Sequence, residues 1–246
     1  MEQAVTFSSQ GQVIFANLGV PSDGSPCVIM SHGLEGSKDS KKWLLIASRL
    51  YQSGFSYLRY NYRGCGEGRE ISEGRFEDTT LSGRIQDYQA AIDFVQTTKA
   101  GRNRLAVVGS SLGGTVAIAA HDVRIKTIVT LAVPYKFIIP PDDKFIVHKD
   151  ERFLELYSGR RLKREFFTDI NKYDVSSIIG KIRCPLLVIH GSADEIVPLE
   201  SARHLYEKAK EPKRMEIIEG GSHRLDESNH IEQVIRLTSG WFEQYL

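Results

Sequence analysis

The sequence lacks several features that would restrict the protein to a specialised class. Its three cysteines, Cys27, Cys65 and Cys184, are odd in number and form no C-x-x-C pair. This argues against a disulfide framework or a zinc site and predicts reduced thiols. No apolar run approaches the roughly 18 residues of a membrane span. Residues 1–6 lack the basic start and apolar core of a signal peptide, so we expect a cytoplasmic protein that does not enter membranes.

An excess of charge of one sign is also absent. The 246 residues include 32 Lys and Arg and 31 Asp and Glu, a formal net charge of +1 at pH 7, and the chain has no long basic cluster. Binding to nucleic acid or anionic membranes through electrostatics requires a basic face, so we expect neither partner. The length fits one domain over residues 1–246 with a substantial core.

Short apolar runs alternate with helical periodicity along most of the chain. Residues 5–8 and 13–18 predict a hairpin. Further strands are expected at 27–30, 55–60, 105–108, 126–132, 185–189 and 215–218. Helices are expected at 39–52, from a cap at Asp78 or Thr79 to about 98, at 114–120, at 200–210 and from 227 to the end. This alternation predicts an α/β fold with a mostly parallel sheet, an antiparallel N-terminal hairpin and helices on both faces.

Residues 134–178 interrupt the alternation. No strand is evident from 134 to about 173, and helical pieces are expected near 150–156 and 162–170. We therefore predict a small helical cap inserted at the carboxyl edge of the sheet. The segment is rich in aromatic residues: Tyr135, Phe137, Phe145, Phe153, Tyr157, Phe166, Phe167 and Tyr173.

The pentapeptide 109–113 (GSSLG) stands between a buried apolar strand and a helix of small residues. Strand, G-x-S-x-G and helix together form the context of a nucleophile elbow. The frame selects Ser111, because centring it on Ser110 would require glycines where Val108 and Leu112 stand. A glycine-rich turn without chemistry is the alternative, and the partners of the serine decide between the two.

A serine hydroxyl needs a base, and the base needs a group that orients it. In open α/β sheets such groups gather at the carboxyl ends of strands. Asp194 follows the strand at 185–189, and His223 follows the strand at 215–218. The order Ser…Asp…His is typical of a triad on this fold. We predict Ser111 as nucleophile, His223 as base and Asp194 as acid.

Other candidates for base and acid are placed less well. His190 begins the loop that presents the aspartate, and we interpret it as structural. Glu195 is expected to face outward, and Asp226 lies too close to His223 along the chain to come from a separate strand end. An aspartate at the start of a loop is otherwise often a turn or cap residue.

Hydrolysis through a tetrahedral intermediate also requires N–H donors for the developing oxyanion. The backbone N–H of Leu112 begins a helix directly after the serine, and we expect the second donor from Leu34 in the loop after residues 27–30. We assign His32 to shaping that loop. No H-E-x-x-H motif, cysteine pair or carboxylate cluster is present, so we expect no metal and no cofactor.

These pieces, as an ordered set, resemble the α/β-hydrolase family over nearly the whole chain. They are residues 32–36 (HGLEG), 61–66 (NYRGCG), 109–114 (GSSLGG), 190–198 (HGSADEIVP) and 221–223 (GSH). Within the family the chain looks most like bacterial carboxylesterases of the feruloyl (cinnamoyl) type, on residues 74–81 (GRFEDTTL) and the compact insertion. The resemblance implies Ser111, His223 and Asp194 as the triad. Ser110 departs from it, because many such esterases carry histidine there; dienelactone-hydrolase-like and prolyl-peptidase-like relatives carry serine.

We therefore predict a serine hydrolase that cleaves a small-molecule ester of an aryl or a short- to medium-chain acid through an acyl-enzyme. Phe137, Phe166 and Phe167 are expected to line the acyl pocket, although packing alone accounts for most aromatics of an insertion. A serine peptidase and a thioesterase of the same fold are alternatives, and a non-catalytic binding protein is disfavoured because all three triad positions are filled. The chain leaves open whether it is a monomer or a homodimer.

Overall fold

The structure is a computed structural model and describes residues 2–101 and 103–246. The strands of its large sheet are β1 (Glu2–Ser9), β2 (Gln12–Gly19), β3 (Cys27–Ser31), β4 (Ser56–Tyr60), β5 (Leu105–Ser110), β6 (Ile125–Leu131), β10 (Leu186–Gly191) and β11 (Lys213–Ile218). Their spatial order is β1-β2-β4-β3-β5-β6-β10-β11. β2 runs antiparallel to β1 and to β4, and the other neighbours are parallel. The predicted mostly parallel sheet with an antiparallel hairpin is confirmed.

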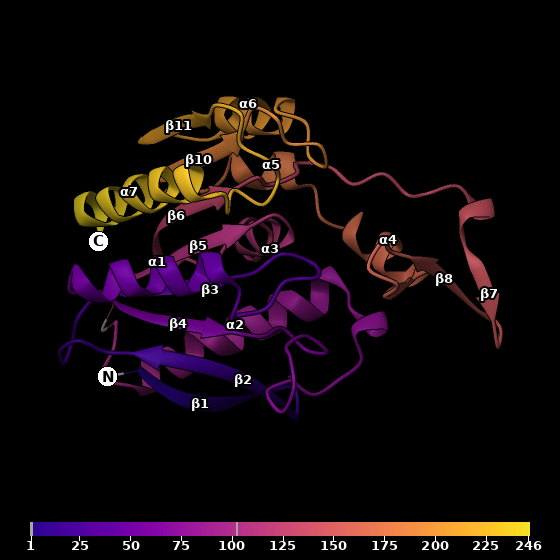
Figure 1. Ribbon diagram of the computed structural model, residues 1–246, viewed down its shortest axis with the longest axis horizontal. Coiled ribbons are helices and arrows are strands. Elements are labelled where there is room, and N and C mark those ends of the chain that lie inside the picture. Colours follow the sequence, from indigo (N-terminus) through magenta and orange to yellow (C-terminus); the bar gives the residue numbers. More distant parts are fainter. Residues whose placement is uncertain (1, 102) are drawn as a thin grey trace.

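Helices cover both faces of this sheet (Figure 1). They are α1 (Lys41–Gln52), α2 (Leu81–Thr97), α3 (Leu112–Ala120), α5 (Val175–Ile179), α6 (Glu200–Lys208) and α7 (Ser228–Tyr245). Alternate residues of β3 pack on opposite faces: Val28 and Met30 join the core under α1 and α7, and Ile29 joins the core under α2 and α3. Burial on both faces explains the continuous apolar runs. None of the helices described is long and apolar enough to cross a bilayer.

The start of α2 differs from the prediction. Residues Phe76–Asp78 form a short 3-10 helix, η1, so neither Asp78 nor Thr79 caps the long helix. Thr80 is the cap, and its hydroxyl accepts a hydrogen bond of 3.0 Å from the Gly83 N–H. A side-chain oxygen at this position satisfies one of the N–H groups left free at a helix start.

The 134–178 segment contains a second sheet and is only partly helical. It holds η2 (Asp142–Lys144), β7 (Ile146–His148), β8 (Glu151–Glu155), β9 (Arg161–Lys163), α4 (Arg164–Ile170) and α5. The helix predicted near 162–170 is confirmed as α4. The helix predicted near 150–156 is wrong, because these residues form the central strand β8, paired antiparallel with β7 and β9. Only Phe153 of β8 is buried, and the strand is stabilised by pairing with β7 and β9 on either side. Figure 1 shows β7, β8 and α4 extending from one side of the body.

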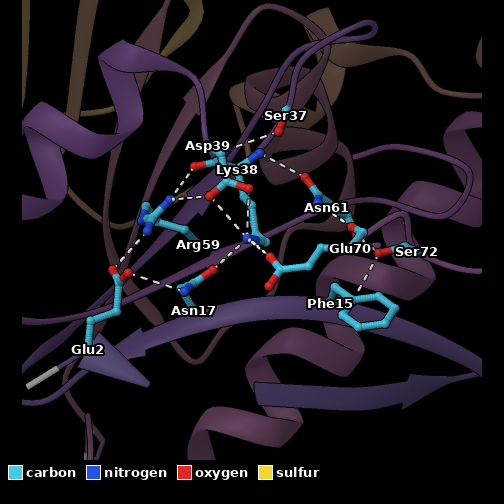
Figure 2. A network of polar contacts seen from close by, with 10 residues as sticks. All are labelled: Glu2, Phe15, Asn17, Ser37, Lys38, Asp39, Arg59, Asn61, Glu70 and Ser72. Atoms are coloured by element: carbon cyan, nitrogen blue, oxygen red, sulfur yellow. Dashed lines mark hydrogen bonds and ion pairs between the residues drawn. The ribbon is translucent and has the colours of Figure 1, made fainter. Parts of the chain in front are cut away.

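A polar cluster around two buried cations joins the N-terminal hairpin to the loop before α1 (Figure 2). We call it the Lys38 network, and it consists of Glu2, Asn17, Lys38, Asp39, Arg59 and Glu70. The Lys38 ammonium lies 2.8 Å from Asp39 Oδ2 and 2.5 Å from Glu70 Oε2. The Arg59 guanidinium pairs with Glu2 at 2.8 Å and with Asp39 at 3.0 Å. Each buried cation is therefore matched by carboxylates at the edge of the fold.

Candidate active site

The turn between β5 and α3 places Ser111 in an unusual backbone conformation. Its φ is +52° and its ψ is −125°, a backbone conformation that residues other than glycine rarely adopt. Its N–H donates to the Leu131 carbonyl at 2.8 Å, which fixes the turn against β6. Gly113 is required on the other side, because a Cβ there would collide with the Ser31 carbonyl oxygen. The turn is sharp, as the G-x-S-x-G pattern predicted, and its serine is half-buried at the wall of a cavity.

The loops after β10 and β11 bring Asp194 and His223 into contact. Nδ1 of His223 lies 2.9 Å from one carboxylate oxygen of Asp194 and 3.1 Å from the other. The Asp194 side chain is fully buried, whereas 13 % of the His223 side chain is exposed. Glu195 is exposed, as predicted, and accepts a hydrogen bond of 3.4 Å from the His223 backbone N–H. Asp226 pairs with Arg224 at 2.9 Å.

The Asp194 carboxylate is held in its ionised form. Burial alone would raise its pKa, but hydrogen bonds from His190, from His223 and from the backbone N–H groups of Val197 and Ile196 outweigh burial and hold the pKa well below its usual value. His190 also bonds the Val197 carbonyl oxygen at 2.8 Å, so it braces the loop that carries Asp194. The imidazole of His223 therefore faces a fixed negative charge.

Ser111 and His223 line one cavity of about 960 Å³, and Asp194 lies behind His223. Within the described residues, the Ser111 hydroxyl makes no hydrogen bond to His223. Catalytic hydrogen bonds of this kind are often long before substrate binds. The structure thus brings together all three residues that the sequence singled out, with the Asp194–His223 contact formed.

The loop after β3 lies against the serine. A Cβ at Gly33 would lie 4.0 Å from Ser111 Oγ. Nδ1 of the buried His32 lies 2.7 Å from the Gly33 carbonyl oxygen, and its Nε2 accepts a hydrogen bond from the Tyr62 N–H at 3.1 Å. Burial, together with the nearby charge of Arg84, lowers the pKa of His32 to about 3, so its ring is neutral at pH 7. Its contacts agree with the predicted role in shaping the loop.

Arg84 of α2 also holds this loop, and the sequence analysis did not predict its role. Its side chain is fully buried and donates to the carbonyl oxygens of Gly33 at 3.2 Å and Leu34 at 2.7 Å. The guanidinium lies 4.6 Å from the centre of the Tyr62 ring. Among the described residues, no carboxylate lies within ion-pair distance of Arg84. Leu81 and Tyr88 lie three and four residues from Arg84, so the three residues share one helix face. This position on an apolar face was the signal in the sequence that Arg84 is buried.

The two residues predicted as oxyanion donors, Leu34 and Leu112, both line the cavity. Neither backbone N–H has an acceptor in the part of the chain that the structure describes. Leu112 is the first residue of α3, where N–H groups are free and the helix dipole favours negative charge. These two N–H groups are therefore the candidate donors for an anionic oxygen.

The 134–178 segment supplies one wall of the cavity. Phe137, Phe166 and Phe167, the residues expected at an acyl pocket, all line it. Apolar residues that the sequence did not single out join them: Leu154, Leu156 and Leu162. Lys42 of α1 lines the same cavity. In the described residues, no group of three or more His, Cys, Asp or Glu side chains is arranged to hold a metal ion.

Residues 45–246 match the prolyl oligopeptidase family, which covers most of the chain. The chain belongs to this family. The chain is 29% identical over 231 residues to the uncharacterized protein YfhR of Salmonella typhimurium, covering 90% of this chain and 74% of YfhR. It is 27% identical over 200 residues to the human protein ABHD12B, covering 76% of this chain and 51% of ABHD12B.

Solved structures with a similar backbone show the fold of this prolyl oligopeptidase family member. The esterase Est1E of Butyrivibrio proteoclasticus, solved with ferulic acid bound, has a TM-score of 0.85 at 22% identity and covers 98% of this chain and 99% of its own. The α/β hydrolase GrgF of a Penicillium species has a TM-score of 0.83 at 18% identity, covering 100% of this chain and 99% of its own. The chain has the α/β-hydrolase fold, as predicted.

Proposed function

We propose that this protein is a serine esterase that cleaves carboxylic esters of aryl or short- to medium-chain acids. The observation that carries the proposal is the contact between a buried, ionised Asp194 and His223 at a cavity that Ser111 lines from a strained turn. Such strain is found at functional sites, and a nucleophile, a base and an orienting acid are what acyl transfer requires.

In the proposed reaction, Ser111 Oγ attacks the ester carbonyl carbon while Nε2 of His223 takes the hydroxyl proton. Asp194 stabilises the imidazolium that forms, and the N–H groups of Leu34 and Leu112 bind the oxyanion. The intermediate collapses, and the alcohol leaves with the proton from His223. Water then attacks the acyl-enzyme by the reverse set of proton transfers and releases the acid.

The acyl group of the substrate would occupy the apolar wall formed by the 134–178 segment. Phe166 and Phe167 are 3 % and 8 % exposed and pack edge to face, which makes this wall rigid as well as apolar. The ferulic acid bound to Est1E, a protein of the same fold, supports an aryl acid. We expect Phe167→Ala or Phe137→Ala to change the preference among acyl chain lengths. Unchanged selectivity in both variants would contradict this assignment.

A serine peptidase is the second candidate, because the family to which the chain belongs is that of prolyl oligopeptidase. A thioesterase requires the same residues and the same cavity. Assay of p-nitrophenyl esters, feruloyl esters, acyl-CoA thioesters and aminoacyl amides side by side distinguishes the three. We expect the highest kcat/KM with an ester, and a higher value for an amide would establish the peptidase.

A fluorophosphonate probe tests the nucleophile directly. We expect the wild type and Ser110→Ala to be labelled and Ser111→Ala to remain unlabelled, because the probe reacts only with an activated serine. Ser110→Ala is a matched control, since it removes the neighbouring hydroxyl. Absence of labelling in the wild type, or equal labelling of Ser111→Ala, would refute Ser111 as the activated nucleophile.

A further inference from the structure

Lys42 is a buried lysine beside the proposed active site. It belongs to the first turn of α1, and only 9 % of it is exposed. Its Nζ donates to Ser110 Oγ at 2.9 Å and to the Arg224 carbonyl oxygen at 2.8 Å. Both acceptors are neutral, and among the described residues no carboxylate lies within ion-pair distance of Lys42. A lysine is almost never buried in this way without a paired charge.

The two acceptors are neighbours of the proposed nucleophile and base. Ser110 precedes Ser111 at the end of β5, and Arg224 follows His223 in the loop after β11. One ammonium group therefore ties together two chain segments that are more than 100 positions apart in sequence. Because α1 packs against α7 on the sheet, Lys42 is anchored to a rigid element.

The charge of Lys42 is retained near neutral pH despite burial. Burial lowers its pKa to about 8, Asp226 and Glu227 oppose this change, and the charge of Arg224 adds to it. The Trp43 ring centre lies 5.6 Å from Nζ. At pH 7 the ammonium form predominates, in a place where water screens it little.

We propose that Lys42 is a positioning residue that fixes the segments of Ser111 and His223 relative to each other. The inference rests on the proposed esterase function. The two hydrogen bonds of Lys42 join the residue before the proposed nucleophile to the residue after the proposed base. They therefore set the separation across which the Ser111 hydroxyl and the His223 imidazole must meet.

Two substitutions separate the hydrogen bonds from the charge. Lys42→Met removes both, and Lys42→Gln removes the charge but retains an N–H donor. With a p-nitrophenyl ester, we expect Lys42→Met to lower kcat about tenfold at a nearly unchanged KM, and Lys42→Gln to lower it less, because small misplacements of reacting groups are costly. Lys41→Met, at the exposed neighbouring position, is the matched control and should behave as the wild type.

Ser110→Ala supplies a variant that keeps the charge and removes one acceptor. We expect a lower kcat at a nearly unchanged KM, with a smaller loss than in Lys42→Met because the bond to the Arg224 carbonyl oxygen remains. A wild-type kcat in a folded Lys42→Met, or a loss that appears in KM and leaves kcat unchanged, would overturn the proposal. Ser111→Ala is assayed in parallel: activity that survives this change refutes the proposed function itself, whereas an inactive Ser111→Ala with unaffected Lys42 variants refutes the role of Lys42 alone.

Discussion

Lys38 and Lys42 lie four residues apart and are both buried, but their partners differ in kind. Lys38 contacts the carboxylates of Asp39 and Glu70, whereas Lys42 contacts a hydroxyl and a backbone carbonyl. Lys42 lines the cavity, and none of the six residues of the Lys38 network does. When a buried charge is paired with its own counter-ions, their fields cancel its electric field nearby, and the charge then has a structural role. A buried charge held by neutral groups keeps its field, which acts on whatever lies beside it.

The same contrast separates the two regions as wholes. The Lys38 network contains several ionised side chains in contact, and by composition alone it resembles a catalytic cluster. The site around Ser111 has fewer charges, but it combines a strained backbone with N–H groups that lack an acceptor among the described residues. Backbone strain, more than the number of polar residues, distinguishes the candidate site from the Lys38 network.

The largest expected effect comes from removing the carboxylate that faces the proposed base. Asp194→Asn should lower kcat by about 10⁴-fold, because an amide can hold His223 in the wrong tautomer and does not stabilise the imidazolium. Steady-state kinetics with a p-nitrophenyl ester measure this loss. Glu195→Gln, at the exposed neighbouring carboxylate, is the control and should retain most activity. An Asp194→Asn enzyme with more than a tenth of the wild-type kcat would contradict the assignment.

Lys38→Met should affect stability and leave catalysis alone. Removing one partner of a fully buried ion pair costs about 3–5 kcal/mol. Here the Asp39 and Glu70 side chains are 41 % and 43 % exposed, so water compensates in part, and we expect the free energy of unfolding to fall by about 2–3 kcal/mol. Urea denaturation measures the change, and kcat per folded molecule should equal that of the wild type. Loss of activity at unchanged stability would show that the two lysines do not differ as argued.

Arg84 is a further buried cation, and like Lys42 it is held by neutral acceptors. Arg84→Met leaves the carbonyl oxygens of Gly33 and Leu34 without a donor, at a cost of about 1–2 kcal/mol in the free energy of unfolding. We also expect kcat to fall about tenfold, because the Leu34 N–H is then no longer held toward the oxyanion. Arg84→Lys should restore part of kcat. If Arg84→Met loses stability but keeps the wild-type kcat, Arg84 is a structural residue only.

The sequence predicted those parts of the fold and of the candidate site that local sequence patterns and the general topology of parallel sheets determine. Ser111, Asp194 and His223 each follow an apolar strand, and the carboxyl ends of parallel strands share one edge of a sheet. The G-x-S-x-G pattern indicated the sharp turn because Gly113 is the residue that the nearby β3 backbone requires. These features depend on few long-range details.

What the sequence did not predict depends on contacts with other elements of the fold. β8 was assigned as a helix because a five-residue run carries little periodicity, and its strand form depends on pairing with β7 and β9. Lys42 and Arg84 were missed because a charged residue is expected to face solvent, and only the partners supplied by Arg224, Gly33 and Leu34 make their burial tolerable.

The smallest effect is the most specific to Lys42. Burial lowers its folded-state pKa to about 8 from the 10.5 of a free lysine. Between these values the unfolded chain binds the proton that the folded chain has released, so stability contributed at this position rises with pH. From pH 7 to pH 9 the wild type should gain about 1 kcal/mol in the free energy of unfolding relative to Lys42→Met. Urea denaturation at several pH values measures the difference, with Lys41→Met as control. Parallel curves for the wild type and Lys42→Met would mean that the ammonium is not destabilised by burial, and Lys42 would then resemble Lys38.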